Sequence, residues 1–106
     1  MKTFDDLEFK KQPHRNAFQA KCDLGKGLTL SVVYGEGNYS DVSVVDGVKI
    51  PESYEIAMFF GNDFVPLQQH DDVLGWQTPD HINKIMNEAQ TDPDFVKSRI
   101  DLKHSE

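Results

Sequence analysis

The densest set of side chains that could do chemistry lies between His70 and Thr78. This stretch, HDDVLGWQT, holds an imidazole, two adjacent carboxylates and the only tryptophan of the chain. Two carboxylates can act as general acid and base or hold a metal ion. Asp71 and Asp72 are neighbours, however, and neighbouring side chains on an extended chain point to opposite sides. With His70 and His81 they could form a mixed metal site, but the spacing matches no zinc or calcium motif, so we predict no bound metal and no cofactor.

A structural interpretation of the same stretch is a short helical turn. Asp71 or Asp72 would cap the turn, Val73 and Leu74 would pack inward, and Gly75 would end it. Such a turn would be rigid, because its cap and its glycine are set by local geometry. The sequence leaves open whether the turn is purely structural or also functional.

Trp76 follows that turn and has two interpretations. It can pack over Ile82 and the sheet edge, where it would serve stability alone. It can instead stay exposed beside Asp71 and Asp72 and anchor a partner protein, since tryptophan is enriched among the residues that dominate binding energy. Asp71, Asp72 and Trp76 are therefore the candidate binding residues, and no catalytic residue is assigned.

Two other motifs are weaker. Cys22 is the only cysteine, which excludes an internal disulfide and a multi-cysteine zinc site. It lies on the apolar face of an alternating stretch, with Ala20 and Leu24, which predicts an unreactive core position. Gly35, Glu36 and Gly37 resemble half of a phosphate-binding loop, but the Lys-Ser/Thr pair and the following helix of such a loop are missing.

Charge is unevenly distributed along the chain. The net charge is −7, yet residues 1–35 hold six Lys/Arg against four Asp/Glu, whereas residues 36–106 hold five against fourteen. An acidic body repels phosphates, so we predict no nucleic-acid binding. The acidity serves solubility, or it offers a surface that competes for a basic partner protein. Lys10, Lys11, His14 and Arg15 form a small basic patch, interpreted as protection of an edge strand.

Strands dominate the first two thirds of the chain. Residues 18–24 alternate apolar and polar, and 28–34 do the same after the turn Gly25-Lys26-Gly27, which predicts an antiparallel hairpin. Asp46-Gly47 predicts a second, short hairpin that could project from the sheet. Residues 53–60 are apolar on both faces, which predicts a central or covered strand. Two edge strands complete the expected set, one over residues 5–10 and one over residues 64–67, where Pro66 is tolerated.

Helices are expected only near the end. Thr78 is a good N-cap and Pro79 a good first residue, and Ile82, Ile85, Met86 and Ala89 then form one apolar stripe. Asp92 and Pro93 repeat the start signal before a second short helix. The predicted fold is one α+β domain, residues 1–106, in which a four- to five-stranded antiparallel sheet carries one or two C-terminal helices on one face.

The order of several motifs resembles a family of small, uncharacterised tailed-phage proteins. Phe4-Asp5-Asp6-Leu7-Glu8-Phe9 is similar to the family's F-x-D-L-E-F start, and Gly25-Lys26-Gly27 to its Gly-x-Gly turn before an SVV strand, here Ser31 to Val33. Tyr54 to Ala57 resembles its YE-apolar-A strand, and Asp71 to Thr78 its D-D-V-apolar-G-aromatic-x-T segment. The resemblance covers nearly the whole chain but implies origin and fold more than activity. The segment from residue 38 to 52 is longer than expected.

Three functions from different classes remain open. The leading hypothesis is a non-enzymatic phage accessory protein that binds a protein of the host or the phage. The alternatives are a small hydrolase or metal-dependent enzyme using His70, Asp71 and Asp72, and a structural component of the phage particle. The chain has no apolar run of the roughly 20 residues that span a membrane, and its single cysteine favours a reducing compartment. We therefore expect it in the cytoplasm of the infected bacterium, with no membrane association.

Overall fold

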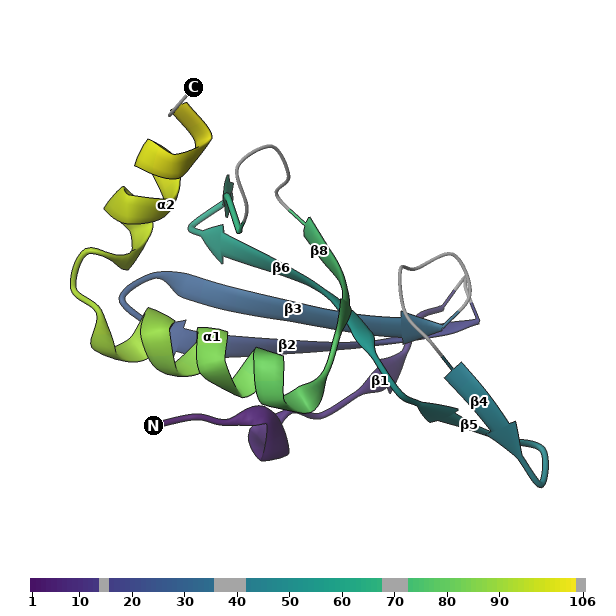
Figure 1. Cartoon of the computed structure of the whole chain (residues 1–106). Helices are drawn as coiled ribbons and strands as arrows, with labels where there is room; N and C mark the ends of the chain where they lie inside the picture. The colour runs from purple at the N-terminus through teal and green to yellow at the C-terminus, as the bar shows by residue number, and fades with distance from the viewer. Residues whose placement is uncertain (14–15, 36–41, 68–72, 105–106) are drawn as a thin grey trace.

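A computed structural model of the chain describes residues 1–13, 16–35, 42–67 and 73–104. In these residues, one antiparallel sheet carries helices on one face, so the α+β prediction is confirmed (Figure 1). The strands of this sheet are β1 (Lys10–Lys11), β2 (Ala17–Gly25), β3 (Leu28–Gly35), β6 (Tyr54–Phe60), β7 (Asp63–Val65) and β8 (Val73–Gln77). The helices are η1 (Phe4–Asp6, a 3-10 turn), α1 (Pro79–Thr91) and α2 (Phe95–His104).

The strand order is β1-β2-β3-β6-β7, and β8 also pairs with β6. Met58 of β6 pairs with Leu30 on one edge and with Val65 on the other. Ile56 pairs with Val32 on the first edge and with Leu74 of β8 on the second. Strand β6 is therefore central, as its two apolar faces predict, and β7 and β8 share its second edge.

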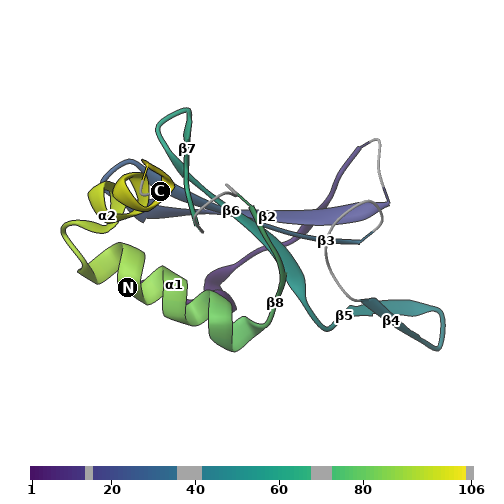
Figure 2. The same ribbon diagram turned by 45° about the horizontal axis from the view of Figure 1, so that its top comes forward.

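Both predicted hairpins form. The loop between β2 and β3 has Lys26 at φ 56° and Gly27 at φ 81°, after Gly25 at φ 85°. Positive φ at both loop positions is the geometry that matches strand twist in two-residue hairpins. The same geometry recurs at Asp46 and Gly47, between β4 (Val42–Val45) and β5 (Val48–Pro51). These two strands form a separate ribbon that projects from the main sheet (Figure 2).

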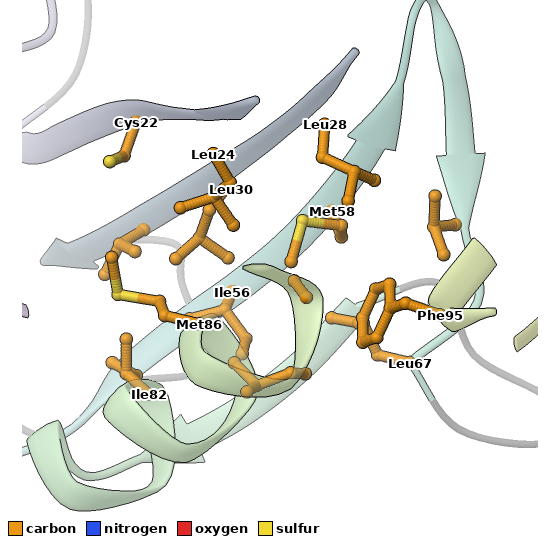
Figure 3. Close-up of a cluster of buried hydrophobic side chains, with 14 of the residues drawn as sticks. Cys22, Leu24, Leu28, Leu30, Ile56, Met58, Leu67, Ile82, Met86 and Phe95 are labelled. Atoms are coloured by element: carbon orange, nitrogen blue, oxygen red, sulfur yellow. The ribbon is translucent and has the colours of Figure 1, made fainter. Parts of the chain in front are cut away.

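The core lies between the sheet and α1 (Figure 3). The side chain of Thr78 caps α1 by accepting a hydrogen bond from the His81 N–H at 3.3 Å. The apolar stripe of α1 is buried as predicted, with Ile82, Ile85, Met86 and Ala89 facing the sheet. Phe18, which the alternation of residues 18–24 predicts on the same face, is only half-buried. The sheet contributes the buried residues Ala20, Cys22, Leu24, Leu28, Leu30, Val32, Tyr54, Ile56 and Met58.

The N-terminal segment differs from the predicted edge strand. Residues 4–6 form η1 because Thr3 and Asp6 close a cap: the Thr3 N–H donates to Asp6 Oδ2 at 2.8 Å, and the Asp6 N–H donates to the Thr3 carbonyl at 3.0 Å. Strand pairing then begins only at Lys10. The segment brings aromatic rings onto the end of the sheet beyond α1, where Phe4, Phe9, Phe18, Tyr34 and Tyr54 form a contiguous cluster.

Candidate functional site

Of the three predicted binding residues, Asp71 and Asp72 lie outside the described residues, as does His70. Trp76 belongs to β8. The prediction of a helical turn is therefore wrong for residues 73–75, which pair as a strand along the part of the β6 edge that β7 leaves open. The physical reason is that pairing satisfies backbone groups of both strands, and a short turn at that edge would leave those of β6 without partners.

Strand β8 contains a bulge at Trp76. Leu74 pairs with Ile56 and Gln77 pairs with Tyr54, so two residues of β8 stand opposite the single residue Glu55. The Gln77 side-chain amide donates to the Gly75 carbonyl at 3.0 Å, which ties the bulge together locally. The bulge thus has a defined geometry that is supported from both strands.

Trp76 itself is both exposed and strained. Its φ is 53°, in the left-handed region that a bulky side chain rarely adopts. Its side chain is 57% exposed, so it is not the buried cover of the helix start that one interpretation predicts. An exposed aromatic side chain held in a strained backbone is the kind of observation from which a functional role can be inferred.

The face of the sheet opposite α1, here called the outer face, carries Trp76 and its neighbours. Side chains alternate along each strand, so residues paired across the strands form rows on this face. One row is Lys21, Ser31, Ala57 and Val73, and the next is Asp23, Thr29, Phe59 and Phe64. Glu55, opposite the bulge, belongs to a third row with Gln19 and Val33. Among the described residues, no helix packs on this face (Figure 2).

One end of the outer face is apolar. The rings of Phe59 and Phe64 lie 4.6 Å apart, and Phe64 is 49% exposed. Val73 is half-buried beside them in the adjacent row. We call Ala57, Phe59, Phe64, Val73 and Trp76 the apolar end. In the sequence, Ala57 and Phe59 already make β6 apolar on its second face. Strand pairing adds Phe64 opposite Phe59 and Trp76 opposite Glu55, four residues apart along the same edge of β6.

The other end of the outer face is polar and basic. Gln12 Nε2 donates to Gln19 Oε1 at 3.3 Å, and Gln19 Nε2 donates to Ser31 Oγ at 2.9 Å. Beside this ladder is an open hollow of about 410 Å³, called the basic hollow, lined by Glu8, Lys10, Lys11, Gln12, Pro13, Gln19 and Lys21. Lys10 and Lys11 were predicted as edge protection, and they do form the edge strand β1.

Cys22 and His81, which could carry chemistry, lie away from the outer face. Cys22 is buried in the core, and burial raises the pKa of its thiol. His81 is exposed in the first turn of α1 and lines a second hollow with Lys84 and Arg99, cations that would repel a metal ion. In the part of the chain that the structure describes, His, Cys, Asp and Glu side chains form no group of three or more suited to a metal.

No protein-family model, curated protein or solved structure matches this chain. The resemblance to tailed-phage proteins therefore stays a prediction. Neither α1 nor α2, nor η1 before them, has the length and apolarity to cross a membrane, within the residues described. The outer face, with its apolar end and its basic hollow, is the feature of the fold that best supports a function.

Proposed function

We propose that this chain is a non-enzymatic accessory protein of a tailed phage, which acts in the cytoplasm of the infected bacterium by binding a host or phage protein. Binding takes place at the apolar end of the outer face, with Trp76 as the anchor. The observation that carries the proposal is that Trp76 is 57% exposed while its backbone is held at φ 53°.

Energetics support this role for Trp76. A left-handed conformation costs a non-glycine residue roughly 1–2 kcal/mol, so the fold keeps an aromatic side chain here at the expense of its own stability. Covering the exposed part of a tryptophan would contribute on the order of 3 kcal/mol to an interface. That value falls in the range of the residues that dominate binding.

The fixed positions of the aromatic side chains also support a binding role. Trp76 is fixed by the paired bulge, and the Phe59 and Phe64 rings already contact each other. Side chains that are ordered before binding lose little conformational entropy when a partner covers them. A rigid aromatic patch on a sheet is therefore suited to recognition of a protein surface.

Affinity capture from a lysate of phage-infected bacteria tests the proposal, with mass spectrometry of what is retained. The test variant is Trp76→Asn, because asparagine tolerates positive φ and leaves the bulge intact while removing the ring. The matched control is Phe60→Ala: Phe60 is 47% exposed but lies on the core-facing side of β6, with Ile56 and Met58, and not on the outer face. We expect wild type and the Phe60 variant to retain the same partner and Trp76→Asn to lose it. Equal retention by all three would refute this site.

A further inference from the structure

We infer that the segment bound at the outer face is acidic as well as apolar, with its carboxylates in the basic hollow and separate apolar side chains against Trp76 and against the Phe59–Phe64 pair. This inference rests on the proposed function and adds the chemistry of the partner. It reverses the expectation, drawn from the net charge of −7, that an acidic surface would select a basic partner.

The charges around the basic hollow favour an acidic partner. Lys10 pairs with Gln19, and Lys21 lies two residues farther along β2, so the two ammonium groups are diagonal neighbours on one face. Lys11 lines the same hollow, and Glu8 is the only carboxylate among its described lining residues. Three lysines gathered around one hollow, on a chain with an excess of acidic residues, favour an occupant with negative charge.

The overall charge indicates which kind of anion fits. The chain carries a net charge of −7, which repels the continuous phosphate backbone of a nucleic acid. A short peptide segment with few carboxylates meets less of this repulsion, and its apolar side chains can cover the apolar end. The hollow is therefore better matched to an acidic peptide than to a nucleic acid.

The distance between the basic hollow and the apolar end sets the length of the bound partner segment. Lys21, Ser31, Ala57 and Val73 form one row across four strands, so Lys21 and Val73 are three strand spacings apart, or about 14 Å. The two residues between them have small, uncharged side chains, Ser31 and Ala57. An extended segment covers that distance in roughly four residues. The partner segment should thus place its acidic residues about four positions from its apolar anchor.

Synthetic peptides test this chemistry directly. The first probe is a fluorescein-labelled peptide of about 12 residues with two glutamates placed roughly four residues from two leucines. The second has glutamine in place of both glutamates, and the third has lysine there. We expect fluorescence anisotropy to show binding of the glutamate peptide, weakened about tenfold by glutamine, by added salt and by Lys21→Glu. Lys97→Glu, an exposed lysine of α2, is the control with the same change in net charge.

Charge reversal separates an electrostatic contact from a damaged fold. If the lysine peptide binds Lys21→Glu better than it binds wild type, the carboxylate site is supported. A single-stranded thymidine oligonucleotide of similar length that binds more tightly than the glutamate peptide would overturn the inference. So would equal binding of the glutamate and glutamine peptides.

The capture experiment distinguishes this inference from the proposed function. A Lys10→Glu, Lys21→Glu double variant should lose the partner that wild type and Lys97→Glu retain. If the double variant retains it while Trp76→Asn does not, the acidic partner is wrong and the binding site at Trp76 stands. If both variants retain it, both proposals fail.

Discussion

Gln90 of α1 and the backbone of Lys2 form a reciprocal pair of hydrogen bonds. Gln90 Nε2 donates to the Lys2 carbonyl and Gln90 Oε1 accepts from the Lys2 N–H, each at 2.8 Å. Two turns earlier on the helix, Asn83 Oδ1 accepts from the Phe4 N–H at 2.7 Å. These polar side chains hold the N-terminal segment along α1, and the segment in turn delivers Phe4 to Tyr54, with ring centroids 5.2 Å apart.

Replacing Gln90 by alanine should therefore loosen the N-terminal segment. We expect a loss of about 1 kcal/mol in the free energy of unfolding, a typical net value for hydrogen bonds that are partly exposed. Urea denaturation measures it. Gln90→Glu is the matched variant, because it keeps an acceptor for the Lys2 N–H but removes the donor to the Lys2 carbonyl, and its loss should be smaller. Equal losses in both variants would contradict the reciprocal arrangement.

Truncation of the buried strand residues tests the core. Leu30 is 0% exposed and Ile56 is 1% exposed, and both lie under α1. Changing either to alanine should lower the free energy of unfolding by about 2–5 kcal/mol, through lost burial and the cavity left behind. Thr29→Ala on the outer face is the control and should cost much less. A small effect at Leu30 and Ile56 would refute the packing of the sheet against α1.

The strained backbone at Trp76 predicts that replacing this residue by glycine does not reduce stability. Trp76→Gly should raise the free energy of unfolding, or leave it unchanged, because glycine adopts φ 53° without steric cost. The expected gain is up to about 1 kcal/mol, since relief of the left-handed conformation is offset by glycine's greater freedom in the unfolded chain. Thermal unfolding measures it, with Trp76→Ala as the comparison that keeps the strain. A loss of several kcal/mol would mean that Trp76 is a structural residue.

Alkaline pH should destabilise the fold through the tyrosines. Burial raises the pKa of Tyr54, with a further contribution from Tyr34, and burial also raises the pKa of Tyr34. The neutral phenol is thus favoured in the folded state. Its contribution to stability is complete below the unfolded pKa of about 10 and is lost as the pH rises through the higher folded value. The urea midpoint is measured below and above the pKa range of the tyrosines. Its fall between the two conditions should be smaller for Tyr54→Phe than for wild type, and an identical fall would contradict the prediction.

Local patterns were sufficient to predict the hairpins and α1. Asp46-Gly47 specifies its turn by backbone geometry alone, and the stripe from Ile82 to Ala89 has one helical period. Strand β8 escaped prediction because its bulge inserts an extra residue at Trp76, and this breaks the alternation by which strands are recognised. The cap of η1 was visible in Thr3 and Asp6, but the apolar Leu7 and Phe9 suggested a strand instead.

The candidate site was harder to predict from the sequence than the hairpins and α1, because tertiary structure brings its residues together. Trp76 was recognised from its residue type and neighbours alone. Its companions Phe59 and Phe64 come from a different hairpin, and only the pairing of β6 with both β7 and β8 places them on the same face. Lys10 and Lys11 were interpreted as edge protection. Strand register, and not spacing in the chain, brings Lys21 beside Lys10 and into the row that ends at Val73.

The ends of the sheet also affect how the molecule would associate with copies of itself. Unpaired strand edges act as templates for further strands, which is how fibrils grow. Here the outermost strands are poor templates: β1 has two residues, both lysines, β7 has three, and β8 is interrupted at Trp76. At these three strands, an incoming strand would find neither a long nor a regular ladder to extend. They therefore guard against fibril growth where they border the sheet, while the outer face stays open to a partner.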